Sequence, residues 1–67
     1  MNFHYELLRD YKAHYEFERE RLKRVQSLQD EVQARATQII LDWIDFEIIT
    51  AQEELDLYIA NERKHAS

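Results

Sequence analysis

Residues 39–49 of this chain have the sequence Ile-Ile-Leu-Asp-Trp-Ile-Asp-Phe-Glu-Ile-Ile. On a helix, at about 100° per residue, their apolar side chains cover well over half of the circumference. A helix with solvent on one side needs a single apolar stripe, whereas a helix that contacts two or more neighbours needs a wider one. We therefore predict that this segment lies at the centre of a multi-helix core, with Trp43 and Phe46 as its largest anchors.

Two apolar stripes overlap in this segment. The first comes from the N-terminal half with spacings of mainly three and four residues, which is typical of coiled coils. Between residues 22 and 46 its members are Leu22, Val25, Val32, Ala36, Ile39, Trp43 and Phe46, with Gln29 as a polar interruption. The second stripe begins at Ile40 and consists of Ile40, Ile44, Ile48, Ala51, Leu55 and Tyr58 or Ile59. The residues predicted for the core or an oligomer interface are Leu22, Val25, Val32, Ile39, Ile40, Trp43, Ile44, Phe46, Ile48 and Leu55.

The composition of the whole chain favours helix. There is no Gly and no Pro in 67 residues, although average usage would give roughly eight of these two residues together. There is no Cys either, so disulfides do not compensate for the small core that so short a chain builds. We predict a single small all-α domain over residues 1–67 that is stabilised by association with itself or with another protein.

Two paths of the chain are compatible with this pattern. In the first, the chain turns near residues 26–29 and forms a helical hairpin, with Ser27 as the N-cap of the second helix. Residue k of the first helix then lies opposite residue 54 − k or so, which places Tyr11 against Trp43 and Tyr15 against Ile39. In the second path the chain is one continuous helix, roughly 90–100 Å long, in a coiled-coil oligomer.

The hairpin is favoured because it places the aromatic-rich first half over the apolar second half. A hairpin alone still leaves one side of residues 39–59 uncovered. Two hairpins that dimerise into an antiparallel four-helix bundle would bury that side. The predicted fold is therefore an antiparallel four-helix bundle of two hairpins.

The charge of the chain restricts its partners. Fourteen acidic and nine basic residues give a net charge of −5, which argues against nucleic acids and against anionic membrane surfaces as ligands. Residues 39–49 are too short and too acidic to span a bilayer. The sequence does not begin with a basic segment followed by an apolar one, so we expect a cytoplasmic protein.

No combination of residues indicates catalysis. Without Cys or Gly, the chain has no thiol nucleophile and no phosphate-binding loop, so we predict no enzymatic activity and no cofactor. His14 lies four residues after Asp10 and four before Glu18, and we interpret this row as a surface polar network rather than a metal site. Glu47 lies between the two apolar stripes and is expected to reach solvent or to pair with an Arg, His or Tyr of the opposite helix.

These observations predict a non-enzymatic protein–protein interaction module. It would form a homodimer or tetramer through an apolar helix face and bind another protein, as a small regulator, adaptor or assembly factor. The candidate partner contacts outside the main stripes are Tyr5, Phe17, Arg21 and Arg24. The alternative is a subunit whose core is completed by a different protein. An acidic nucleic-acid mimic is less well supported, because acidic and basic residues are mixed through residues 16–24. A metal-binding bundle is the least supported alternative.

Overall fold

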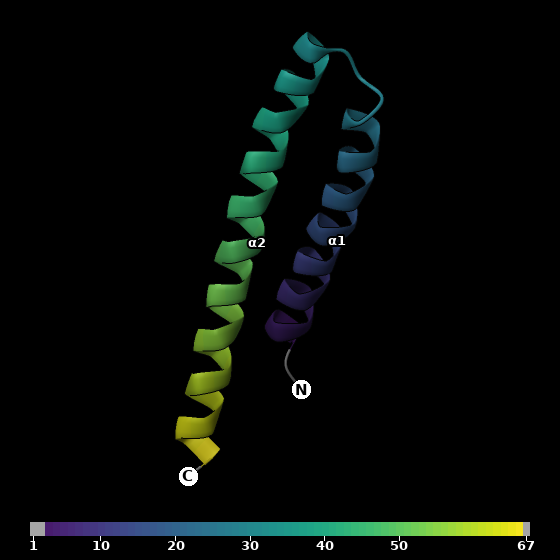
Figure 1. The fold of residues 1–67 in the computed structure, drawn as a ribbon. Helices are drawn as coiled ribbons and strands as arrows, with labels where there is room; N and C mark the ends of the chain where they lie inside the picture. The colour runs from purple at the N-terminus through teal and green to yellow at the C-terminus, as the bar shows by residue number, and fades with distance from the viewer. Residues whose placement is uncertain (1–2, 67) are drawn as a thin grey trace.

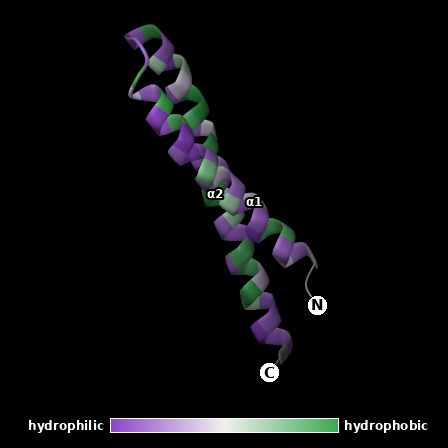
Figure 2. Ribbon diagram, turned by 90° about the vertical axis from the view of Figure 1, so that its right-hand side faces the viewer, coloured by the Kyte–Doolittle hydropathy of each residue, from purple (hydrophilic) through white to green (hydrophobic). Residues whose placement is uncertain are grey.

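The computed structural model, which describes residues 3–66, is a helical hairpin. Helix α1 (Phe3–Gln26) and helix α2 (Glu31–Ala66) run antiparallel and side by side, and α2 extends beyond the N-terminal end of α1 (Figure 1). The helices diverge toward that open end (Figure 2). The principal extents are 55 × 16 × 12 Å. The predicted all-α hairpin is thus confirmed, and over the described residues the chain is not one continuous helix.

The chain reverses direction without a residue in the left-handed region. From residue 3 to residue 66, no backbone φ angle is positive. Instead, the end of α1 tightens: the N–H of Leu28 donates to the carbonyl of Val25 at 3.0 Å, and the N–H of Gln29 donates to that of Gln26 at 3.1 Å. These are 3₁₀-type bonds, and they satisfy carbonyls that the end of an α-helix leaves open. The turn therefore needs no Gly.

Asp30 is the N-cap of α2. Its Oδ1 accepts a hydrogen bond from the N–H of Gln33 at 2.8 Å, and its carbonyl accepts the first intrahelical bond from Ala34. The prediction of Ser27 as the cap is wrong. The Ser27 hydroxyl donates backward to the carbonyl of Arg24 at 2.6 Å and belongs to the end of α1.

The later start of α2 changes the register between the helices. The ring of Tyr15 contacts that of Trp43, with centroids 5.4 Å apart, rather than lying opposite Ile39. The Tyr11 hydroxyl reaches Glu47 rather than Trp43. The predicted register of 54 − k is therefore wrong by about one helical turn, because the turn was placed too early in the chain.

Helix α2 supplies every buried residue among those described. They form a row with spacings of four and three residues, which we call the inner stripe: Thr37, Leu41, Ile44, Ile48, Ala51 and Leu55. This spacing places them on the side of α2 that faces α1. The predicted second stripe is correct for Ile44, Ile48, Ala51 and Leu55 but not for its first member. Ile40 is exposed, and the apolar part of the row begins at Leu41 instead.

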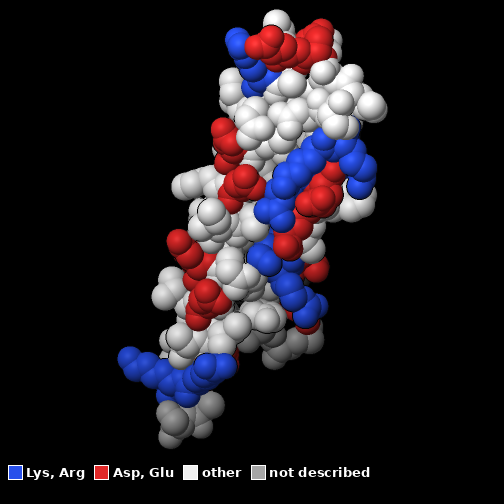
Figure 3. All heavy atoms as spheres, in the orientation of Figure 1, with Lys and Arg blue, Asp and Glu red and all other residues white. Residues whose placement is uncertain are grey.

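The side of α1 that faces α2 is only half-buried and mixes apolar with basic side chains. Its residues are Leu8, Lys12, Tyr15, Arg19, Leu22 and Gln26. Arg19 reaches Asp45 of α2, with Nη1 3.4 Å from Oδ1. The long stems of such residues cover apolar surface while their heads reach carboxylates, and acidic groups along α2 lie beside basic groups along α1 in Figure 3. The core between the two helices is therefore thin.

Amide and hydroxyl groups join the two helices next to the turn. The Gln26 Nε2 donates to the carbonyl of Ala34 at 2.9 Å and to Gln38 Oε1 at 3.0 Å. Thr37 is only 7% exposed, and its hydroxyl donates to Gln29 Oε1 at 2.6 Å. Because a buried hydroxyl without a partner is costly, these bonds help to set the register that the structure adopts.

Neither helix contains an apolar stretch of the length and low charge that crossing a bilayer requires, over residues 3–66. The apolar residues of α2 alternate with hydrophilic ones along its length, as the coloured ribbon shows (Figure 2). The apolar side chains of α2 therefore form rows along particular sides of the helix rather than one continuous apolar segment.

Candidate interaction surface

A second row of side chains with heptad spacing runs along α2, away from α1. We call it the outer stripe: Val32, Ala36, Ile39, Trp43, Phe46, Thr50, Glu53 and Leu57. All of these are exposed except Thr50, which is half-buried. Their spacing alternates strictly between four and three residues, as in the seam of a coiled coil. At about 100° per residue, the outer stripe lies roughly 150° around the helix from the inner stripe.

The outer stripe exposes the largest apolar side chains predicted for the core. Ile39 is 71% exposed, Trp43 51% and Phe46 63%. The hairpin does not cover them because α1 occupies the other side of α2. Contiguous apolar surface of this kind marks interaction sites more often than scattered apolar residues do. The two stripes seen in residues 39–49 are thus real, and only one of them is buried within the chain.

An aromatic cluster connects the outer stripe to α1. The ring of Tyr15 meets Trp43 edge to face, with an interplanar angle of 83°. Tyr11 packs against Tyr15 with centroids 4.7 Å apart and an angle of 66°. Such edge-to-face pairs are favourable at these separations. Trp43 is therefore held along one edge, while about half of its surface faces solvent.

Glu47 is tied to the same cluster. The Tyr11 hydroxyl donates to Glu47 Oε2 at 2.6 Å, so the carboxylate between the two stripes pairs with a tyrosine of the opposite helix, as the sequence predicts. This hydrogen bond raises the pKa of Tyr11, since a phenol that donates to a carboxylate is favoured in its neutral form. The bond links α1 to α2 along the edge of the outer stripe.

The apolar surface continues onto the N-terminal part of α1. An open hollow of 420 Å³ is lined by His4, Leu7, Leu8 and Tyr11. Leu7 and Tyr11 are both exposed, and Tyr11 lies on the same edge as Glu47. The surface therefore includes side chains from both helices.

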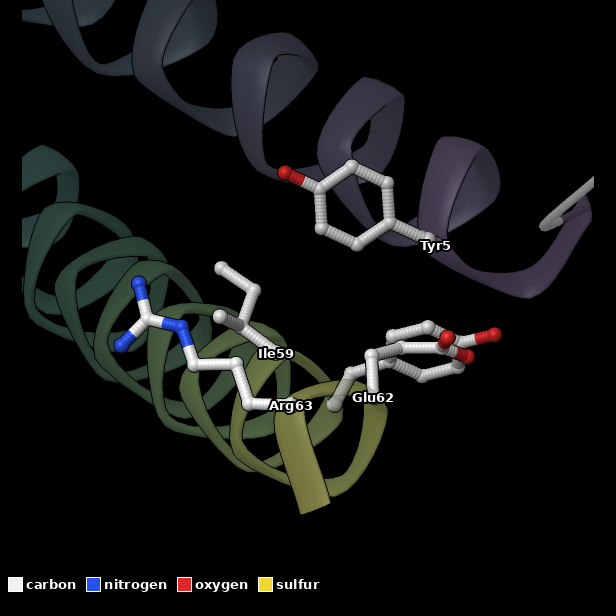
Figure 4. A pocket seen from close by; sticks show the side chains of 5 residues that line it. Tyr5, Ile59, Glu62 and Arg63 are labelled. Carbon is white, nitrogen blue, oxygen red and sulfur yellow. The ribbon is translucent and has the colours of Figure 1, made fainter. Parts of the chain in front are cut away.

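A separate open pocket of 260 Å³ lies at the open end of the hairpin, lined by Tyr5, Tyr58, Ile59, Glu62 and Arg63. Tyr5 projects from α1 toward α2, with Ile59 and Arg63 on one side and Glu62 on the other (Figure 4). The rings of Tyr5 and Tyr58 lie 5.8 Å apart. Partial burial, and then the nearby Glu62, raise the pKa of Tyr58. Tyr5, a predicted partner contact, is therefore half-buried in a contact within the chain.

The other predicted partner contacts lie away from the outer stripe. Phe17 is 65% exposed on the side of α1 turned away from α2. Arg21 donates from Nη2 and Nε to Glu18 Oε2 at 2.6 and 3.0 Å. This pair lowers the pKa of Glu18 and raises that of Arg21. Arg24 is exposed near the end of α1. The structure thus does not bring these residues together with the apolar surface.

The Asp10, His14 and Glu18 row forms no cluster suited to a metal. No group of three or more His, Asp or Glu residues between positions 3 and 66 is arranged to hold a metal ion. Glu18 is engaged by Arg21, and the His14 ring packs against Tyr15 with centroids 5.5 Å apart. These contacts join Glu18 and His14 to neighbours outside the row.

Comparison of the chain with protein-family models, with curated proteins and with solved structures gave no match. The residues that sequence reasoning missed are Thr37 and Leu41 of the inner stripe. The signal was present, because the four-and-three spacing runs back from Ile44 through Leu41 to Thr37. It was obscured by the adjacent pair Ile39 and Ile40, which are equally apolar.

Proposed function

We propose that this protein is a non-enzymatic interaction module whose hairpins associate with one another through the outer stripe. The single observation that carries the proposal is the uncovered heptad row on α2, the helix that also supplies the buried residues of the described part of the chain. Heptad rows of apolar residues are the usual seam between helices. Two associated hairpins would form a four-helix assembly in which each α2 is packed on two sides.

The size of the apolar surface supports a stable contact. The large exposed apolar residues of the outer stripe and of the adjoining part of α1 are Val32, Ile39, Trp43, Phe46 and Leu57 of α2 with Leu7 and Tyr11 of α1. Each leaves on the order of 100 Å² of its surface exposed. Together they approach the roughly 800 Å² that each partner contributes to a standard protein–protein interface.

The thin core of the single hairpin supports the same proposal. Its buried apolar side chains are Leu41, Ile44, Ile48, Ala51 and Leu55. A single core in a chain of this length rarely supplies more than about 3–5 kcal/mol, and such chains commonly gain stability by oligomerising. Burial of a second row against another copy would supply the apolar contacts that one hairpin lacks.

A second candidate is a subunit whose outer stripe is covered by a different protein. The observation in its favour is the acidic end of the stripe, where Glu53, Glu54 and Asp56 lie close together. A partner helix with basic residues at the matching positions would complement this end of α2. Regulator, adaptor and assembly-factor roles all remain compatible with either candidate.

The test compares two variants with the same substitution. Phe46→Lys places a charge within the outer stripe, while Phe17→Lys places it on the far side of α1 at a similar exposed fraction. Multi-angle light scattering over a dilution series should give the wild type and Phe17→Lys at least twice the chain mass of 8.2 kDa. Phe46→Lys should give the chain mass, with its helicity retained by circular dichroism.

Two outcomes would overturn the proposal. A wild type that has the mass of one chain throughout the dilution series would exclude self-association and favour the second candidate. A Phe17→Lys variant that dissociates as fully as Phe46→Lys would show that the outer stripe is not the contact.

A further inference from the structure

We propose that two copies pair through α2 in an antiparallel orientation, about a two-fold axis between Ile44 and Asp45. This inference rests on the proposed self-association and specifies its orientation and register. Residue k of one outer stripe would lie opposite residue 89 − k or so of the second copy. The argument depends on the symmetry of the row, on its charges and on the position of its aromatic residues.

The spacing of the outer stripe is symmetric about its centre. In an antiparallel pair of helices, each layer combines one position that follows a four-residue step with one that follows a three-residue step. The register above satisfies this rule along the whole row. It places Val32 opposite Leu57 of the second copy and Trp43 opposite Phe46 of the second copy. A shift by one turn in either direction would leave one end of the row without a counterpart.

The layers are also compatible in size. Ala36, the smallest member, lies opposite Glu53 of the second copy, the member least suited to a tight core. A small residue there leaves room for the carboxylate of Glu53 to extend to solvent. The two-fold axis repeats each layer. The layers that contain Thr50 and Glu53 therefore lie toward the two ends of the row, and the layers that contain Trp43 and Phe46 lie at its centre.

The charges beside the stripe favour the same orientation. In an antiparallel pair, the same flank of each helix meets, so Arg35 lies beside Asp56 of the second copy. The Arg35 side chain is 75% exposed and reaches back to Glu31, with Nη2 2.6 Å from Oε1. Its guanidinium therefore lies on the surface at the edge of the row. Two such pairs would form, one at each end of the interface.

A parallel pair in register would place like charges together. Glu53 would face its own copy within the seam, and the neighbouring Glu54 and Asp56 would lie beside theirs. In the antiparallel pair the two acidic ends lie roughly 30 Å apart at 1.5 Å per residue. That distance exceeds the Debye length of about 8–10 Å near physiological ionic strength, so their repulsion would be largely screened.

The aromatic residues converge at the proposed axis. Trp43 and Phe46 are the largest members of the stripe and lie on either side of its centre. The two-fold axis brings the Trp43 and Phe46 rings of both copies into one cluster, where edge-to-face contacts are favourable. Tyr15 of the same chain already packs edge to face against Trp43, so the Trp43 ring is oriented before the second copy binds. Central aromatic anchors are typical of strong interfaces.

The test uses single-cysteine variants, because the natural chain has no Cys. Val32→Cys and Leu57→Cys are prepared separately, then oxidised alone and as an equimolar mixture at a concentration where the wild type is associated. The mixture should yield a disulfide-linked dimer containing one chain of each kind, identified by mass spectrometry. Each variant alone should give little covalent dimer, because its two thiols would lie roughly 38 Å apart at 1.5 Å per residue.

The outcomes separate this inference from the proposed function. Rapid cross-linking of Val32→Cys with itself, without mixed dimer, would overturn the antiparallel orientation while leaving self-association intact. Failure of every combination to cross-link, in variants that light scattering shows to be associated, would overturn the register. A wild type with the mass of a single chain would overturn both proposals. Phe17→Cys mixed with either variant is the control for random collision, because Phe17 lies outside the stripe.

Discussion

Two isoleucines on α2 allow the packing to be tested with one type of substitution. Ile44 is 3% exposed in the inner stripe, and Ile39 is 71% exposed in the outer stripe. Replacing a buried Ile with Ala removes apolar contacts and leaves a cavity, which costs about 2–5 kcal/mol. Since a single core in a chain of this length rarely supplies more than about 3–5 kcal/mol, we expect Ile44→Ala to be largely unfolded.

Ile39→Ala should behave differently in the isolated hairpin. Because most of this side chain is exposed, the loss of burial is less than about 1 kcal/mol. Ala also gains roughly 0.4 kcal/mol in helix propensity over Ile, so the two effects nearly cancel. At concentrations where copies associate, the same variant should lose stability, because the outer stripe would then be buried. The cost of Ile39→Ala should therefore rise with protein concentration, whereas that of Ile44→Ala should not require association.

The assay is urea unfolding followed by far-ultraviolet circular dichroism, at several protein concentrations for the wild type and both variants. At the lowest concentration, a cost below about 1 kcal/mol for Ile44→Ala would contradict a core in the inner stripe. Equal losses of unfolding free energy for Ile44→Ala and Ile39→Ala at that concentration would also contradict the reasoning, because the assignment of the two sides of α2 would then be wrong.

Three further perturbations address the cap, the interhelical hydrogen bond and the outer side of α1. Asp30→Ala should cost about 0.5–2 kcal/mol of unfolding free energy, whereas Asp30→Asn should retain most of it, because Asn is an equally good N-cap; equal melting temperatures for the wild type and Asp30→Ala would contradict this. Since the Glu47 hydrogen bond raises the pKa of Tyr11, its contribution to stability is present below the ordinary tyrosine pKa of about 10 and is lost as pH rises above it. Urea unfolding at roughly pH 8 and pH 11 should show a smaller loss for Tyr11→Phe than for the wild type, and an identical loss would exclude this link. Phe17→Ser should change the unfolding free energy by no more than about 0.5 kcal/mol, since the ring is exposed and away from α2; a larger loss in thermal unfolding would indicate that Phe17 is packed.

The sequence was sufficient to predict an all-helical chain, and it favoured a hairpin with a turn near residues 26–29 over one continuous helix. The absence of Gly and Pro and the long four-and-three spacing left little room for another secondary structure. The position of the cap was harder to predict, because Ser27 and Asp30 are both good N-caps and lie one turn apart. The structure uses Asp30, and this choice moves the register by about one turn. Local preference therefore located the turn but did not fix its length.

The sequence also predicted two apolar stripes on α2 but not which of them faces α1. Ile44 and Trp43 are both apolar and lie in rows of the same spacing. Their different exposure depends on the side on which α1 packs. Basic residues such as Arg19 did not indicate which side of α1 faces α2, because their spacing alone resembles that of a solvated face. Which stripe of α2 faces α1 is decided by tertiary packing, through contacts such as that of Arg19 with Asp45, which the sequence of either helix alone does not predict.

The glycine-free turn affects how this protein can change over evolution. None of its residues has a positive φ angle, so no position in the turn requires Gly for steric reasons. Reversal of the chain depends instead on hydrogen bonds, among them the Asp30 cap and the 3₁₀-type bonds at the end of α1. A mutation that removes the cap would weaken this reversal, and a continuous helix in which α1 packs on α2 of a neighbour would then compete with the hairpin. The contacts of the hairpin are then exchanged between copies, as in domain swapping.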